Sequence, residues 1–242
     1  MGVTFGWGPT EAAVLARDAA CLVVVDVLSF TTSVGVAVES GAAVYPYRWR
    51  DETAVAYAAK LDAALAVGRS EASPETPWTL SPAALRAAPP TPRLVLPSPN
   101  GSTISAGAGD ATVVAASFRN RMAVARWLAR HGYGSESGPL AVVASGERWP
   151  DGSLRPALED LLGAGGVLSA LCALGSYALT PEARAAATLW EATEDPVAEL
   201  HRCASGRELY EYGYPQDVAV AAEVDTSETV PVLTDGAFLE AP

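Results

Sequence analysis

Short apolar runs alternate with stretches of helical periodicity along most of the chain. Residues 21–27, Cys-Leu-Val-Val-Val-Asp-Val, form the clearest run, which is typical of a strand covered on both faces, as in a parallel sheet. Further extended segments are predicted at 3–6, 42–47, 64–68, 93–97, 112–117, 140–145 and 230–233. Strands that alternate with helices predict a three-layer α/β/α sandwich around a mostly parallel sheet with right-handed crossovers.

The predicted helices occupy the intervals between these strands. They are expected at 9–19, 31–40, 51–62 and 156–174, with one ending near 130 and a short one at 82–87 within a segment rich in Pro, Ser and Thr. Gly41 and Asp51 are natural helix caps. Because residues after 176 are mostly helical to about 223, we expect one α/β domain over residues 1–242, with a helical subdomain or added layer at 176–225.

Charge and composition exclude several classes of protein. The chain has 28 acidic and 16 basic residues, a formal net charge of −12, which opposes binding to nucleic acid or an anionic membrane. No apolar stretch reaches the roughly 18 residues of a membrane span, and the start lacks a signal-peptide pattern. Three scattered cysteines favour a reducing, cytoplasmic location over disulfides or zinc. The high apolar content would allow a homodimer.

Polar side chains follow four of the predicted strands, at the positions where open α/β sheets bind ligands. They are Asp26, Thr31 and Thr32 after 21–27; Asn100, Gly101, Ser102 and Thr103 after 93–97; Arg119, Asn120 and Arg121 after 112–117; and Glu147 and Arg148, with Glu159 and Asp160 further on, after 140–145. Hydroxyls and N–H groups at helix starts favour anions such as phosphate. Oxygen-rich ligands suit Mg²⁺ rather than zinc.

Most of these residues also have a structural interpretation. A strand-end acid such as Asp26 often caps a helix, Asn-Gly often forms a turn, and acids at a helix start are favoured by its dipole alone. Arg119 and Arg121 could be solvated surface. Leu28 stands where haloacid-dehalogenase phosphatases have a second acid, and no P-loop is present. The glycines at 163, 165 and 166 lie inside a predicted helix, which favours close helix packing over a dinucleotide-binding loop.

The order of these motifs resembles the 2-phosphosulfolactate phosphatase (ComB-like) family. The matching elements, which together span about residues 20–233, are Val24-Val-Asp26-Val-Leu with Thr31-Thr32; Ser98-Pro-Asn100-Gly101-Ser102; Ala116-Ser117-Phe118-Arg119-Asn120; Leu158-Glu159-Asp160; Gly206-Arg207-Glu208-Leu; and Gly213-Tyr-Pro-Gln-Asp217-Val. The resemblance implies a Mg²⁺-dependent phosphatase acting on a small phosphorylated sulfonate. The chain departs from the family at Ser29-Phe30, where an arginine is usual, and in the loosened Gly68-Arg69-Ser70-Glu71.

We therefore predict a Mg²⁺-dependent phosphatase of a small phosphorylated acid, 2-phosphosulfolactate or a related phosphate monoester. Asp26 with Glu159 or Asp160 would hold the metal. The substrate would be bound by Thr31, Thr32, Arg69, Asn100, Gly101, Ser102, Thr103 and Asn120, and Arg69, Arg119 or Arg121 would stabilise developing charge. The alternative, suggested by the missing arginine, is a non-catalytic small-anion-binding or regulatory protein on the same scaffold.

Overall fold

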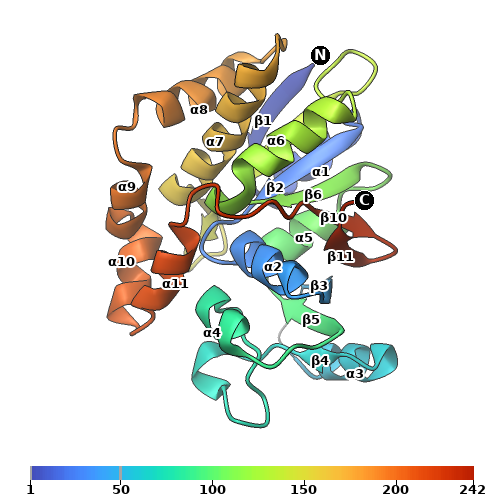
Figure 1. Cartoon of the computed structure of the whole chain (residues 1–242), viewed down its shortest axis with the longest axis vertical. Helices are drawn as coiled ribbons and strands as arrows, with labels where there is room; N and C mark the ends of the chain where they lie inside the picture. Colours follow the sequence, from blue (N-terminus) through green and yellow to red (C-terminus); the bar gives the residue numbers. More distant parts are fainter. Residues whose placement is uncertain (1, 49–50) are drawn as a thin grey trace.

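A computed structural model describes residues 2–48 and 51–242. Within these residues a nine-stranded mixed sheet, in the order β1-β7-β2-β6-β10-β11-β3-β5-β4, is covered by helices (Figure 1). The strands are β1 Val3–Trp7, β2 Cys21–Val25, β3 Ala43–Tyr47, β4 Ala64–Leu65, β5 Arg93–Pro97, β6 Thr112–Ala116, β7 Leu140–Ala144, β10 Pro231–Thr234 and β11 Ala237–Glu240. The predicted three-layer α/β/α class is confirmed.

The helices predicted at 31–40, 51–62, 82–87 and 156–174 lie within about two residues of those bounds, whereas the helix predicted at 9–19 ends at Leu15. The helices are α1 Gly8–Leu15, α2 Phe30–Glu39, α3 Glu52–Leu61, α4 Pro82–Ala87, α5 Gly101–Ala106, α6 Arg121–Arg130, α7 Leu158–Leu174, α8 Pro181–Ala192, α9 Pro196–Arg202, α10 Ala204–Glu211 and α11 Pro215–Ala221, with 3₁₀ turns η1 Arg69–Glu71 and η2 Phe118–Asn120. Both predicted caps are present: the Asp51 side chain accepts from Thr53 N at 3.0 Å, and Gly41 has φ +87°. In the described part of the chain, no helix has the length and apolar character needed to cross a membrane.

Strand β2 explains why the run at 21–27 is apolar at every position. Cys21, Val23 and Val25 pack into a core with α6, α7 and α8, whereas Leu22 and Val24 pack into a second core with α1, α2 and α5. All five side chains are fully buried, and such burial stabilises the fold by roughly 1.5–3 kcal/mol for each large aliphatic side chain. The strand therefore packs against both helical layers, and Asp26 directly follows it at the carboxyl edge of the sheet.

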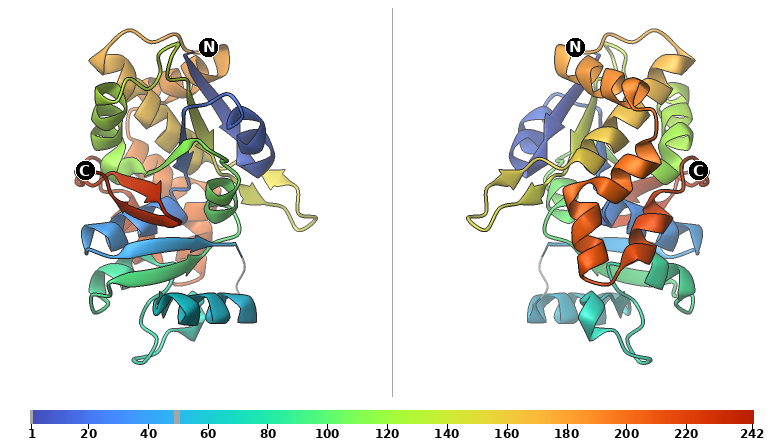
Figure 2. Two further views of the ribbon diagram at one scale, coloured as in Figure 1. Left: turned by 90° about the vertical axis from the view of Figure 1, so that its right-hand side faces the viewer. Right: turned by 90° about the vertical axis from the view of Figure 1, so that its left-hand side faces the viewer.

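A C-terminal hairpin joins two groups of parallel strands. β10 and β11 pair with each other antiparallel; β10 also pairs with β6 through Val232 and Val114, and β11 with β3 through Phe238 and Val44. The hairpin lies beside the C-terminus in Figure 2. The extended segment predicted at 230–233 corresponds to β10, whereas β11 was not predicted.

The C-terminal helices pack against the sheet layers. α8 contacts α7 and β1, and α11 contacts α4 and α10, so the chain from α9 to α11 lies along one side of the molecule (Figure 2, right). Leu200, Leu209 and Val218 belong to the same core as Val23. The predicted layer at 176–225 thus shares its core with the central strands.

The glycines of α7 permit close packing, as interpreted from the sequence. A Cβ atom at Gly165 would collide with the backbone oxygen of Ala186 on α8, and one at Gly163 would lie 2.8 Å from side-chain atoms of Val25 and Val27.

We expect Gly165→Ala to lower the free energy of unfolding by about 1–3 kcal/mol, because a backbone atom cannot move aside cheaply. The matched control is Gly35→Ala in α2, where a Cβ meets nothing within 4 Å, and which should be neutral or stabilising by up to about 1 kcal/mol. Urea unfolding checks both. Equal stability of Gly165→Ala and the parent would contradict the α7–α8 packing.

Candidate functional site

Asp26 ties the end of β2 to the start of α5. Its Oδ1 accepts from Phe30 N at 3.0 Å, and its Oδ2 accepts from Gly101 N at 3.1 Å. The side chain is only 7% exposed. Gly101 must be a glycine at this contact, because a Cβ would collide with the Phe30 ring. The loops after β2 and β5 therefore meet at Asp26, as predicted.

Asp160 ties the ends of β2 and β7 to the first turn of α7. Its Oδ1 accepts from Val27 N at 2.8 Å, and its Oδ2 accepts from Gly146 N at 2.8 Å. Glu159, its neighbour, is 2% exposed and lies close enough to Asp26 to raise the pKa of that carboxyl. The structure thus brings together the three acids that the sequence suggested.

Glu147 completes a group of four carboxylates, which we call the acid cluster: Asp26, Glu147, Glu159 and Asp160. Burial, with added repulsion from Asp26 and Glu159, raises the pKa of Glu147 to about 8. Burial also raises the pKa of Asp26 to about 6 and that of Asp160 well above its usual range. The acids of the cluster therefore retain their protons to higher pH than exposed carboxyl groups do, because burial disfavours the charged form.

Two short strands hold Glu147 in place. β8 (Glu147–Arg148) pairs with β9 (Leu154–Arg155), and Asn100 connects this hairpin to the loop after β5. Asn100 Nδ2 donates to Glu147 Oε2 at 3.1 Å, and Asn100 Oδ1 accepts from Arg148 Nε at 3.2 Å. Asn100 thus lies beside Glu147, and its side chain joins two loops.

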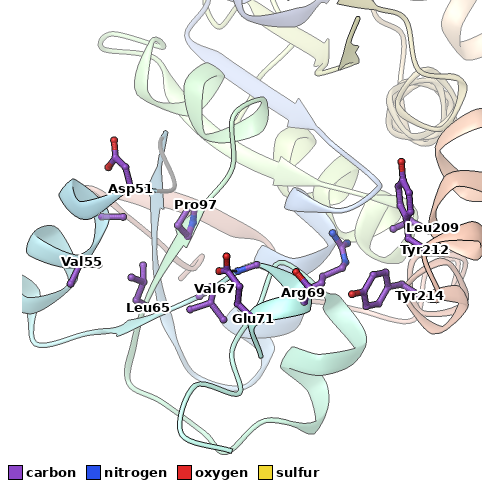
Figure 3. Close-up of a pocket in the computed structure, with 14 residues that line it drawn as sticks. Asp51, Val55, Leu65, Val67, Arg69, Glu71, Pro97, Leu209, Tyr212 and Tyr214 are labelled. Atoms are coloured by element: carbon purple, nitrogen blue, oxygen red, sulfur yellow. Dashed lines mark hydrogen bonds between the residues drawn. The ribbon is translucent and has the colours of Figure 1, made fainter. Parts of the chain in front are cut away.

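Arg69 is the predicted arginine that lies near the acid cluster. Its Nε donates to Asp217 Oδ2 at 2.8 Å, and its Nη2 donates to Ser29 Oγ at 2.8 Å, three residues after Asp26. Asp217 is fully buried and also accepts from Ser81 Oγ. Figure 3 shows Arg69 extending towards Tyr214, whose ring centroid lies 5.5 Å from the guanidinium carbon. Asp217 therefore fixes the direction of Arg69.

The four hydroxyls predicted to bind substrate have different surroundings. Thr31 Oγ1 donates to Asp26 O at 2.8 Å and Thr32 Oγ1 to Val27 O at 2.7 Å, so both stabilise the β2–α2 loop. Thr103 Oγ1 donates to Pro99 O at 2.7 Å. Ser102 Oγ is buried and has no hydrogen-bond partner among the described residues. Of the four, Ser102 alone has a hydroxyl that is not engaged by another described residue.

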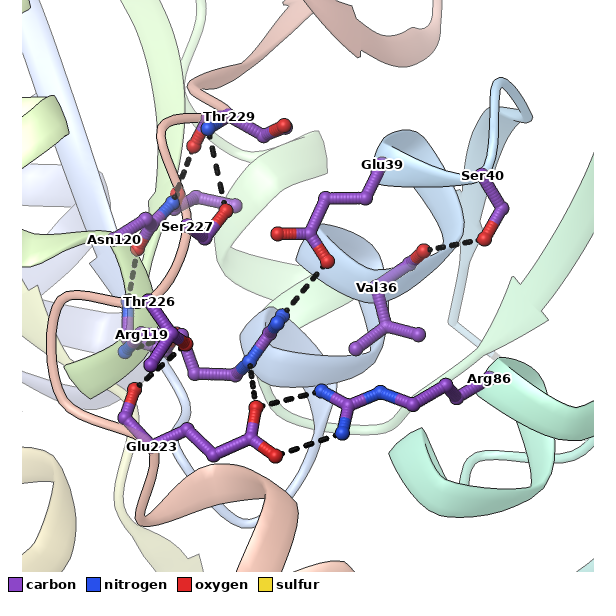
Figure 4. Close-up of polar contacts among 12 residues, drawn as sticks. Val36, Glu39, Ser40, Arg86, Arg119, Asn120, Glu223, Thr226, Ser227 and Thr229 are labelled. Carbon is purple, nitrogen blue, oxygen red and sulfur yellow. Dashed lines mark hydrogen bonds and ion pairs between the residues drawn. The ribbon is translucent and has the colours of Figure 1, made fainter.

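Arg119 and Asn120 make their hydrogen bonds to residues outside the acid cluster. Arg119 donates to Glu39 Oε2 at 3.1 Å and Glu223 Oε2 at 3.2 Å, and Glu223 also accepts two hydrogen bonds from Arg86, both at 2.7 Å (Figure 4). Glu39 is the last residue of α2, about 15 Å along the helix from the Asp26 end. Asn120 is buried and donates to Ala115 O and Thr229 O. Arg121 pairs with Asp225 at 2.6 Å.

The donor set fits Mg²⁺ in chemistry. In the described ranges, no group of three His, Cys, Asp or Glu side chains is arranged to hold a metal ion. Mg²⁺ is usually held by one or two carboxylates, with waters and substrate phosphate as its other ligands. Carboxylates are the ligands of that mode of binding, and binding of a metal ion to Asp26, Glu147 or Asp160 would release the protons that their raised pKa values retain.

Several residues at the site were not assigned to it from the sequence. Glu147 was noted only as one of the polar residues after a strand. Arg155 forms two hydrogen bonds with Glu208, at 2.6 and 3.0 Å, and its charge lowers the pKa of Glu147. Asp217 appeared only within a family motif. The one sequence signal for Glu147 was its position shortly after the buried strand β7.

Comparison with known proteins gives consistent matches. The family model described as 2-phosphosulpholactate phosphatase matches residues 10–236. Proteins named probable 2-phosphosulfolactate phosphatase from Deinococcus radiodurans and a Synechococcus strain are 33% and 32% identical over 60% and 62% of this chain. The aligned regions span only 57% and 58% of those two relatives. A relative of the same name from Thermotoga petrophila is 28% identical over 90% of each chain.

We expect the metal-free protein to lose stability as the pH rises from about 4.5 to about 8. Glu147 has a higher pKa in the folded state, so the folded state binds more protons than the unfolded state across this window, and stability falls as pH increases. Glu147→Gln should flatten the slope, with a remainder from Asp26 and Asp160. The midpoints of urea unfolding, measured with a chelator present at pH 5, 6.5 and 8, give this slope. The exposed Glu136→Gln is the control; identical slopes for all three proteins would contradict this burial of Glu147.

We expect Arg119→Ala to destabilise the fold by about 1–3 kcal/mol, because Glu39 loses its partner in a partly buried pair. Arg126→Ala, which breaks an exposed pair with Glu228, should cost under about 1 kcal/mol. Phosphate affinity, measured by calorimetry, should be the same in both variants and the parent. A tenfold weaker affinity in folded Arg119→Ala would instead place Arg119 in the anion site.

Proposed function

The chain belongs to the 2-phosphosulfolactate phosphatase family, and from this premise we propose that it is a Mg²⁺-dependent phosphatase. Its substrate would be 2-phosphosulfolactate, which the relatives' names suggest, or a related phosphate monoester. The observation that carries the proposal is the buried acid cluster with Ser102 and Arg69 at its side. A cytoplasmic location and a homodimer stay predictions from the sequence.

The proposed reaction is hydrolysis of a phosphate ester. Water adds to phosphorus, the bond between phosphorus and the ester oxygen breaks, and the products are orthophosphate and the alcohol, which takes up the proton. Bound Mg²⁺ would act as a Lewis acid towards the phosphoryl oxygens. We assign Asp26 and Glu159 to hold it. Asp160, like Asp26, accepts a backbone N–H at each oxygen, so both fix the loops that carry the site, and each oxygen keeps a lone pair for a metal ion.

The phosphate would be bound by groups that still have donors to offer. The Ser102 hydroxyl has no partner in the described part of the chain, and it adjoins Gly101, whose N–H contacts Asp26. Arg69 supplies positive charge, and its field already lowers the pKa of Asp26. Because Asp217 holds Arg69 in place, Arg69 can offset the charge of the phosphate without moving. Such preorganised electrostatic stabilisation is usually the largest single contribution to catalysis.

We expect phosphate release from 2-phosphosulfolactate or another monoester in a broad panel, with Mg²⁺ required and chelator abolishing it. Asp26→Asn should lower kcat by at least about 100-fold, because it removes a negative ligand at the centre of the cluster. The control is Asp18→Asn, an exposed change in the turn before β2, with unchanged kinetics.

Two outcomes would count against the proposal. Folded protein that releases no phosphate from any ester with Mg²⁺ is not a phosphatase; if calorimetry then shows phosphate binding, the anion-binding alternative is favoured. Unchanged kinetics of Asp26→Asn would remove Asp26 from the site.

A further inference from the structure

The hairpin of β8 and β9 places an arginine at the edge of the acid cluster. It projects from the body of the molecule (yellow in Figure 2). Its first residue, Glu147, belongs to the cluster, and the next, Arg148, is exposed. Arg148 Nε donates to Asn100 Oδ1 at 3.2 Å, and Asn100 Nδ2 donates to Glu147 Oε2 at 3.1 Å. A single amide group therefore joins the guanidinium to a carboxylate of the cluster.

The same amide places Arg148 beside the start of α5. Asn100 directly precedes Gly101, whose N–H donates to Asp26 Oδ2 at 3.1 Å, and Gly101 is followed by Ser102, the hydroxyl that we assign to the phosphate. Because Arg148 is bonded to the residue that begins this segment, it lies next to the groups proposed to hold the metal ion and the phosphate.

Arg148 has no acid as a partner, unlike the two arginines already placed at the site. Arg69 and Arg155 each form an ion pair with a carboxylate, at 2.8 and 2.6 Å. Arg148 donates instead to two neutral acceptors, Asn100 Oδ1 and, at 3.3 Å, Gly152 O. No carboxylate of residues 2–48 and 51–242 forms an ion pair with it. These acceptors orient the guanidinium without neutralising its charge.

The substrate named for the relatives carries more negative charge than its phosphate alone. In 2-phosphosulfolactate the carboxylate is bonded to the carbon that bears the phosphate ester, and the sulfonate is on the neighbouring carbon. Both acid groups would therefore lie close to the carboxylates of the acid cluster, where an anion needs a cation to bind it. The planar fork of an arginine matches the oxygens of such groups and can donate two hydrogen bonds to them.

The cavity beside Arg69 offers no comparable site. It has a volume of about 510 Å³ and is shown with its lining side chains in Figure 3. Among the lining residues that the structure describes, Asp51 and Glu71 are carboxylates, Arg69 is the single cation, and none belongs to the acid cluster. Arg148 is therefore the better placed cation for an acid group close to the cluster.

We propose that Arg148 binds an acid group of the substrate, either a carboxylate or a sulfonate, and so favours phosphate esters of acids over neutral esters. The inference rests on the proposed phosphatase function and deepens it, because it names a residue that recognises the acid part of the substrate. Asn100 orients Arg148 for this contact.

The test compares three esters of secondary alcohols in Mg²⁺: 2-phosphosulfolactate, 2-phospholactate, which has the carboxylate alone, and isopropyl phosphate, which has neither acid group. We expect Arg148→Gln to lower kcat/KM for 2-phosphosulfolactate by about tenfold or more, chiefly through KM, and for isopropyl phosphate by less than about threefold, because a hydrogen bond between charged groups is lost only with the acid. An equal loss for 2-phospholactate identifies the carboxylate as the bound group, and a loss confined to 2-phosphosulfolactate identifies the sulfonate.

The matched control is Arg17→Gln, which removes the same charge. Arg17 is exposed in the turn before β2, at the opposite end of that strand from Asp26, so this variant should leave all three esters unchanged. The proposal is overturned if Arg148→Gln affects the three esters alike, as expected of a residue that only holds Asn100 in place. It is also overturned if Arg148→Gln affects none of them, or no more than Arg17→Gln does.

Calorimetry separates this inference from the proposed function. If the parent protein hydrolyses none of the esters, the phosphatase function fails. The assignment of Arg148 stands in that case if 2-phosphosulfolactate binds the parent at least about tenfold more tightly than isopropyl phosphate does and Arg148→Gln removes the difference. A difference that survives Arg148→Gln, equal binding of the two esters, or binding of neither overturns it.

Discussion

The arrangement of the candidate site depends on the two hydrogen bonds that the Asp160 carboxylate accepts. The N–H groups of Val27 and Gly146 lie just beyond two adjacent parallel strands, where the ladder can no longer pair them. Buried N–H groups need acceptors, and leaving one unpaired costs about 1–3 kcal/mol. A single side chain in the first turn of α7 satisfies both, and this brings Glu159 and the loop of Asp26 to the same place.

The hydrogen bonds to Asp160 hold together acids that repel one another when they are ionised. Burial and mutual proximity raise the pKa values of Asp26, Glu147 and Asp160, while the nearest arginines, Arg69 and Arg155, are each paired with another acid. Proton uptake by the acids, which their raised pKa values describe, therefore relieves part of the repulsion. A bound divalent cation would relieve the rest, and binding of that ion would then be linked to proton release and to stability.

The sequence predicted most of the elements but gave no strand order for the sheet. Strand β2 and helix α4 were placed within about two residues, because an unbroken apolar run and a proline after a serine cap are strong local signals. The hairpin of β10 and β11 was missed, although Asp235-Gly236, with φ of +51° and +84°, is a strong hairpin signal. Its insertion between β6 and β3 arises from contacts between distant segments, which local patterns do not encode.

At the site, the positions of short side chains could be predicted from the sequence, whereas the directions of long side chains could not. The end of a strand fixes where the backbone leaves the sheet, so the short side chains of Asp26 and Asn100 lie where expected. An arginine has several rotatable bonds, and its direction is set by distant partners: Arg119 turns to Glu39, whereas Arg69 is held by Asp217, 148 positions away. The cavity beside Arg69 has walls from equally distant segments. Contacts between such distant segments are not encoded in the local motifs.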